Sequence, residues 1–94
     1  MKVGLLTLYL HLPATGSLKE KRSVIKRILA EVNRCGPAFA VAEVENLDDL
    51  SRATIRIAHL ANDSRYTDSA LTQLRTTLEL GKDYAVEGYD LEIL

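Results

Sequence analysis

The sequence predicts an α+β fold in which four strands form one antiparallel sheet and two helices cover one of its faces. Three observations lead to this prediction. Residues 2–12 alternate between apolar and polar side chains, as a strand covered on one side does. Two later segments repeat apolar side chains at helical spacing, and each follows a cap-forming residue. The 94 residues are enough for one domain, spanning residues 1–94.

The first strand should end at residues 13–16, where a proline and a glycine favour a turn. The first helix should begin at Ser17, because Ser17 and Glu20 form a capping box whose side chains satisfy free backbone N–H groups. It should end before Pro37. Its apolar stripe consists of Leu18, Ile25, Ile28, Leu29 and Val32.

Residues 38–44 and 52–61 predict two further strands joined by a short turn. Cap-forming residues at 62–64 start a second helix, with apolar side chains at Tyr66, Ala70, Leu71, Leu74 and Leu78. Residues 84–93 give the last strand. The order βαββαβ is that of a ferredoxin-like sandwich, with an antiparallel four-stranded sheet and two helices on one face.

The composition is that of a globular protein, with 47% hydrophobic and 27% charged residues. The single cysteine, Cys35, fits a reducing compartment, so we expect a cytoplasmic location and interpret Cys35 as a small buried side chain. No apolar run reaches the roughly 20 residues that a membrane span needs. Residues 12–16 match a cell-wall anchor pattern, but they follow strand alternation, and we interpret them as the turn.

Charge is distributed unevenly along the chain. Residues 1–34 have net charge +5 and residues 35–94 have −6, which together give −1. The first helix opens with three cations near its positive dipole end, where free N–H groups suit a phosphate. The candidate anion- or nucleic-acid-binding residues there are Ser17, Lys19, Lys21, Arg22 and Lys26.

Within this set, Lys19, Arg22 and Lys26 share one flank of the helix. Lys21 instead falls near the apolar stripe and should reach past the end of the sheet. The alternative is a solvated face on which Glu20 partly neutralises its neighbours.

On the sheet, Arg52 and Arg56 could contact an RNA backbone. Base stacking is not expected, because only Tyr9 supplies an aromatic ring on the two central strands. Ion pairs of these arginines with Glu43, Glu45 or a carboxylate of a partner chain are the alternative.

The uncovered face of the sheet should carry Val3, Leu5 and Tyr9, joined by Tyr84 or Tyr89 from the last strand. An open apolar patch of this kind often marks an interface, so we expect self-association, as a homodimer. Scattered surface apolar side chains are the alternative.

The sequence offers no catalytic constellation. His11 and His59 have strand parities that place them on opposite faces, and no Cys or His cluster has metal-ligand spacing. We therefore expect a protein that is not an enzyme and that has no metal and no cofactor.

Four short motifs carry a family resemblance: SLKEKR at 17–22, AEV at 42–44, RAT at 52–54 and ND at 62–63. With them the chain resembles the bacterial YlxP-like family, domain of unknown function 503. The resemblance implies a ferredoxin-like fold and genes placed among those for translation and ribosome maturation, and it implies no activity. Relatives often carry Trp shortly before the RAT motif, where this chain has Leu50.

These observations lead to one main hypothesis and two alternatives. The main one is a binding protein that associates with RNA or a ribosomal particle through the basic flank of the first helix. The alternatives are an oligomeric regulatory module that binds a small anionic metabolite, and a protein-interaction adaptor that uses the open sheet face.

Overall fold

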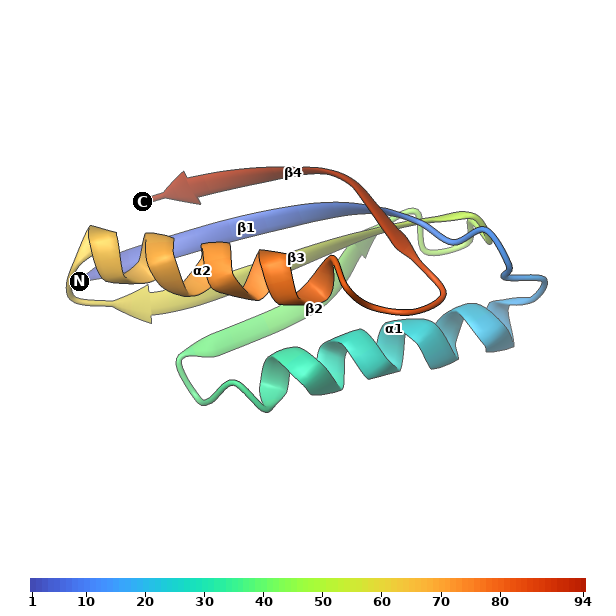
Figure 1. Ribbon diagram of the computed structural model, residues 1–94, viewed down its shortest axis with the longest axis horizontal. Coiled ribbons are helices and arrows are strands. Elements are labelled where there is room, and N and C mark those ends of the chain that lie inside the picture. Colours follow the sequence, from blue (N-terminus) through green and yellow to red (C-terminus); the bar gives the residue numbers. More distant parts are fainter.

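The computed structural model describes all residues from 1 to 94. Its six elements follow the predicted βαββαβ order (Figure 1): β1 Lys2–His11, α1 Leu18–Asn33, β2 Phe39–Glu45, β3 Arg52–Ala61, α2 Ser64–Leu78 and β4 Ala85–Ile93. The strands form one sheet in the order β2-β3-β1-β4, and every neighbouring pair is antiparallel. The predicted ferredoxin-like arrangement is confirmed.

The core lies between the sheet and the two helices, which cover the same face. Residues opposite one another in antiparallel strands share a face, and Leu6 on β1 lies opposite Ile57 on β3 and Leu91 on β4. The alternation predicted for residues 2–12 is therefore confirmed. Leu6, Leu8 and Leu10 on β1, and Leu12 directly after it, are almost completely buried.

Local capping explains where α1 begins. The Ser17 hydroxyl accepts a hydrogen bond from the Glu20 N–H at 3.1 Å. The Glu20 carboxylate reaches the Gly16 N–H at 3.5 Å, one residue before the N–H that a capping box uses. The buried residues of α1 are Lys21, Val24, Ile25, Ile28 and Val32.

Helix α2 begins at its cap Asp63, whose carboxylate accepts from the Arg65 N–H at 2.8 Å. The predicted apolar stripe is shifted at its first turn, since Thr67 is fully buried whereas Tyr66 is 64% exposed. The threonine is accommodated in the buried position because its hydroxyl has polar partners on His59 of β3.

Cys35, predicted to be buried, is exposed just after α1, and its thiol donates to the Glu31 carbonyl at 3.5 Å. That prediction was wrong because α1 ends at Asn33, so Cys35 lies in the turn beyond the helix, next to Gly36 with φ +125°. Neither helix is long and apolar enough to cross a bilayer.

Candidate functional site

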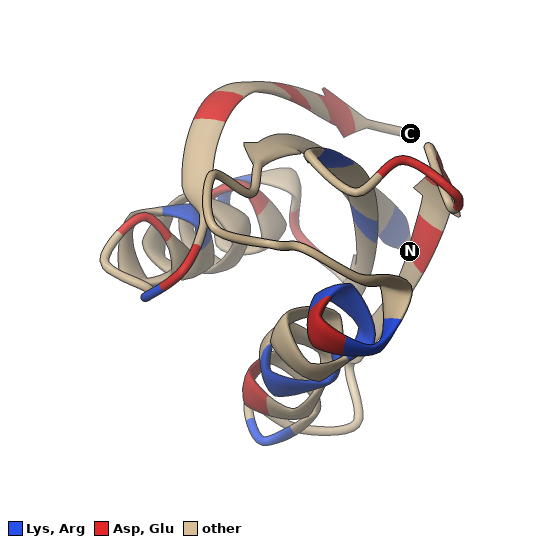
Figure 2. Cartoon of the chain, turned by 90° about the vertical axis from the view of Figure 1, so that its right-hand side faces the viewer, with Lys and Arg blue, Asp and Glu red and all other residues tan.

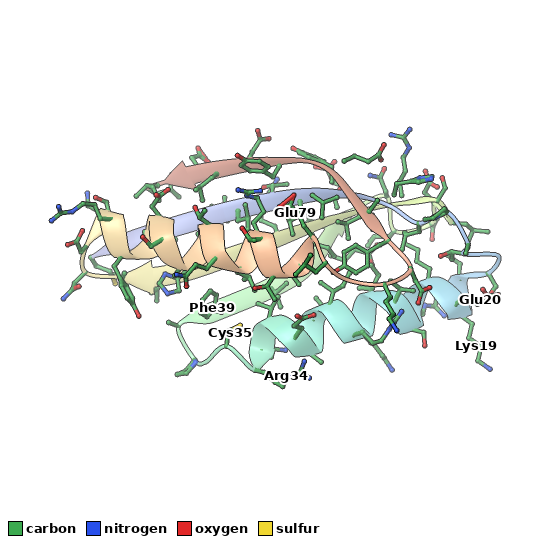
Figure 3. All side chains as sticks on the ribbon, viewed as in Figure 1. Lys19, Glu20, Arg34, Cys35, Phe39 and Glu79 are labelled. Atoms are coloured by element: carbon green, nitrogen blue, oxygen red, sulfur yellow. The ribbon has the colours of Figure 1, made fainter.

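The outer face of α1 carries a stripe of cations. Lys19, Arg22 and Lys26 are exposed, and none of them makes a hydrogen bond or an ion pair within the chain. Spacings of three and four residues place them on one face, over about 10 Å of helix axis. Figure 3 shows Lys19 pointing away from the molecule. In Figure 2 several basic residues lie on α1, whereas the charged residues of β4 are acidic.

Glu20 does not neutralise this stripe. Its carboxylate is directed at the start of the helix, within 3.5 Å of both the Gly16 N–H and the Ser17 hydroxyl, and it forms no ion pair. Ser17 is likewise engaged in capping. We call these three cations, Lys19, Arg22 and Lys26, the α1 stripe. They face solvent, and no acidic side chain of the protein forms an ion pair with them.

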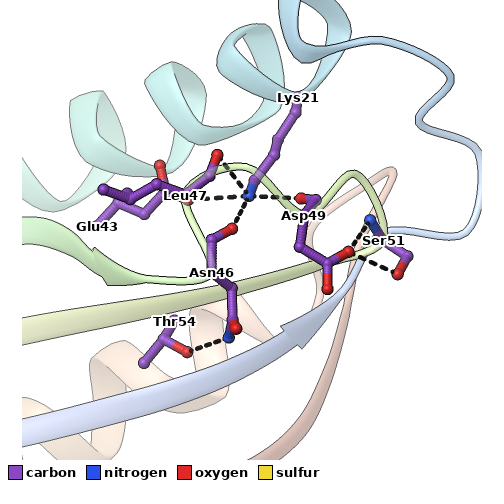
Figure 4. Close-up of polar contacts among 7 residues, drawn as sticks. All are labelled: Lys21, Glu43, Asn46, Leu47, Asp49, Ser51 and Thr54. Carbon is purple, nitrogen blue, oxygen red and sulfur yellow. Dashed lines mark hydrogen bonds and ion pairs between the residues drawn. The ribbon is translucent and has the colours of Figure 1, made fainter.

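Lys21 has a different place from the one predicted. Only 2% of the side chain is exposed, and its ammonium lies inside the connection between β2 and β3 (Figure 4). It donates to the carbonyl oxygens of Asn46 and Asp49, the latter at 2.7 Å, and the Leu47 carbonyl is 3.4 Å away. Glu43 completes the set with a carboxylate oxygen at 3.1 Å. Lys21 is thus unavailable to an external anion, which corrects its assignment to the binding surface.

The β2–β3 connection is shaped to present these carbonyls. Asn46 adopts a left-handed conformation, with φ 61°, and its amide donates to the Thr54 hydroxyl at 3.1 Å. Asp49 accepts from the backbone N–H and the hydroxyl of Ser51, and these bonds lower the pKa of its carboxyl below the ordinary value. Both side chains hold the loop in the geometry that surrounds Lys21.

The sequence contains a pattern that indicates the burial of Lys21. Lys21 precedes Ile25, Ile28 and Val32 by four, seven and eleven residues, so it continues the apolar stripe of α1. A lysine within such a stripe is either extended to the surface or paired inside the protein, and only the loop decides between the two.

Further cations lie along α1. Arg27 pairs with Asp83 at 2.8 Å, with both side chains more than half exposed, so this contact contributes little to stability. Arg34, the C-cap residue of α1, has no partner. The remaining cations with neither an ion pair nor a hydrogen bond, Lys2, Arg52 and Lys82, lie outside this helix.

Arg52 and Arg56 lie on the opposite face of the sheet from α1, so the structure does not combine them with the α1 stripe. Arg56 is half-buried, and its Nε donates to the Thr7 hydroxyl at 3.2 Å. Beside it the Tyr9 hydroxyl donates to Asp90 at 2.9 Å, a bond that raises the pKa of the tyrosine. Neither arginine forms the predicted ion pair with Glu43 or Glu45.

Val3, Leu5 and Tyr9 all lie on the open face of the sheet. Val3 lies opposite Leu60, which is 50% exposed, and Leu5 lies opposite Ala58. The face is therefore apolar near the start of β1 and polar near Tyr9.

The prediction that Tyr84 or Tyr89 joins this face was wrong. Tyr89 lies opposite Leu8 and therefore on the helix side, where the Arg75 guanidinium stands 4.2 Å from its ring centroid. Tyr84 donates to the Leu78 carbonyl at 2.6 Å, and burial raises the pKa of its hydroxyl. Tyr89 shares its face with Leu91, two residues later, which lies opposite the core residue Leu6. The register shift between β1 and β4, at residues 9–10, brings Val86 to the same face.

His11 and His59 lie on opposite faces, as predicted. His59 is only 2% exposed on the helix side, and its Nδ1 lies 2.7 Å from the Thr67 hydroxyl. Burial lowers its pKa, which keeps the imidazole neutral. The sequence parity located His59 but gave no indication of Thr67 as its partner.

Similarity to solved structures supports the fold alone. A de novo designed protein, Foldit4, aligns with a TM-score of 0.55 at 19% identity, over 100% of this chain and 97% of that one. A mutant of SnoaB, a cofactor-independent oxygenase from Streptomyces nogalater, aligns with a TM-score of 0.50 at 16% identity, over 99% of this chain and 90% of that one. No curated protein sequence matches the chain.

The sequence motifs and the fold agree with a match to a family model over almost the whole length. That model, described as a protein of unknown function (DUF503), covers residues 3–91. The chain therefore belongs to the DUF503 family.

Proposed function

We propose that this protein is a cytoplasmic, non-enzymatic binding protein that associates with RNA or a ribosomal particle through the α1 stripe. One observation supports this above the others: Lys19, Arg22 and Lys26 form a row of exposed cations with no counterion in the chain. Phosphates would supply the counterions.

The physical argument concerns charge spacing. A nucleic-acid duplex presents about one phosphate charge per 1.7 Å of axis, so the roughly 10 Å of the stripe faces several phosphates. Lysine and arginine that contact phosphates displace condensed counterions, which makes the affinity fall as salt rises. Such contacts give affinity without sequence preference, in keeping with the single aromatic ring, Tyr9, on the two central strands.

The expected result is a weaker salt dependence when two of these cations are removed. Binding to an RNA hairpin, measured by fluorescence anisotropy over a series of salt concentrations, should show a slope smaller by about 2 for R22Q/K26Q than for the unmodified protein. Glutamine keeps the helix propensity, so the loss would report charge alone.

The matched control is K2Q/R65Q, which removes the same charge from exposed positions outside α1. It should bind the hairpin like the unmodified protein. Equal slopes for R22Q/K26Q and the unmodified protein would refute the proposal. Binding of inorganic phosphate at the start of α1, with no affinity for the hairpin, would instead favour the regulatory module for a small anion.

A second proposal concerns self-association. We propose that two copies dimerise through the open sheet face, because Val3, Leu5, Ala58 and Leu60 form an apolar area there that no helix covers. Sedimentation at micromolar concentration should give a dimer, and Leu5→Lys should give a monomer. A monomer for the unmodified protein would exclude this interface.

A further inference from the structure

A groove opens on the helix side of the sheet, away from the α1 stripe. It has a volume of about 570 Å³, within the range of small-molecule sites. The end of α1, the start of β2, the end of β3 and one side of α2 from Tyr66 to Thr77 line it, and its walls include Phe39, His59, Tyr66, Ala70 and Leu74. Figure 3 shows Phe39 near Cys35 at this end of the molecule.

Three rings are gathered in the groove wall. The His59 ring centroid lies 4.5 Å from that of Phe39 and 5.7 Å from that of Tyr66, both in tilted arrangements. Tyr66 remains 64% exposed at the rim, with no hydrogen bond from its hydroxyl. Exposed aromatic side chains beside a groove offer a face on which another planar ring can stack.

One ring nitrogen of His59 faces this groove without an internal partner. Placing the imidazole proton on Nδ1 uses both contacts of Thr67: Nδ1–H donates to the Thr67 hydroxyl at 2.7 Å, and the hydroxyl donates to the His59 carbonyl at 3.3 Å. The other nitrogen, Nε2, then carries the lone pair. No group of the chain forms a hydrogen bond with Nε2. Because Nε2 is not a fully buried atom, it is in contact with solvent where the ring lines the groove.

We propose that this groove binds a planar aromatic compound whose ring carries an N–H or O–H donor, with the donor directed at His59 Nε2 and the ring stacked against Tyr66 and Phe39. Such a donor is selected because a bound ring that lacks one would exclude water from Nε2 without replacing the hydrogen bond. The compound is either a free aromatic molecule or a base of single-stranded RNA, and only the second source rests on the proposed function.

Indole and 1-methylindole are suitable probes, since they share a ring system and differ in the N–H donor. Titration with indole, followed by NMR, should cause saturable chemical-shift changes at the His59 and Ala70 amides and at His59 Nε2. Binding of 1-methylindole should be about fivefold weaker or more. Tyr66→Ala should weaken indole binding by a similar factor, because stacking is lost.

Tyr9→Ala is the control, as it removes an exposed ring from the opposite face of the sheet and should leave indole binding unchanged. Hexa-adenylate distinguishes the sources: shifts at His59 with the oligonucleotide assign the groove to a base, and shifts with indole alone assign it to a free compound. R22Q/K26Q should still bind indole, so failure of the α1 stripe and failure of the groove are separable. No saturable shift with either probe, or equal affinity for indole and 1-methylindole, would overturn the inference.

Discussion

Replacing Lys21 with Met should lower the free energy of unfolding by about 3–5 kcal/mol, the cost typical of removing one partner from a buried ion pair. The ammonium is the shared donor for the carbonyls of Asn46 and Asp49 and the counterion of Glu43. Methionine fills a similar volume, so little packing would be lost. The loop carbonyls and a carboxylate that is 18% exposed would remain without a donor.

Urea denaturation followed by circular dichroism would measure this loss. Lys19→Met is the matched control, because Lys19 is exposed two residues earlier on the same helix, and its effect should stay within about 0.5 kcal/mol. Adding Glu43→Leu to Lys21→Met should recover part of the stability, since the unpaired charge is then gone. A change below about 1 kcal/mol for Lys21→Met would contradict the role assigned to the ammonium.

Gly4→Ala should be destabilising by about 1–3 kcal/mol, the range for overpacked sites. A Cβ at Gly4 would lie 2.7 Å from Leu71 Cδ1 and closer still to the Thr67 hydroxyl. Thr67 and Leu71 are fully buried, so neither can move aside without disturbing α2. The loss would be steric, since alanine by itself is better than glycine in a strand.

The matched control for this substitution is Gly88→Ala, on the neighbouring strand β4. A Cβ there would meet only Tyr9 Cδ2 at 3.8 Å, an ordinary contact, so stability should be nearly unchanged. The same urea titration serves for both variants. Equal stability of Gly4→Ala and the unmodified protein would show that α2 can shift over β1 at little cost.

The sequence by itself determined the order and type of all six elements. Alternation along residues 2–12, the cap at Ser17 and the cap-forming residues at 62–64 are local signals, and they act between residues a few positions apart. The connection lengths then leave few arrangements, because crossover helices and short hairpins dictate which strands pair. The exposed stripe of Lys19, Arg22 and Lys26 was predictable for the same reason, since helical spacing fixes a shared face.

Tertiary structure decided the features that depend on distant partners. Lys21 is buried because carbonyls 25 to 28 residues away converge on its ammonium, and no local pattern encodes that convergence. Val86 and Tyr89 both face the helices although their positions differ by an odd number, because the β1–β4 register shifts between Tyr9 and Leu10, and a one-residue shift moves a side chain to the other face. Side-chain environment follows long-range register and loop geometry, whereas element type follows neighbours along the chain.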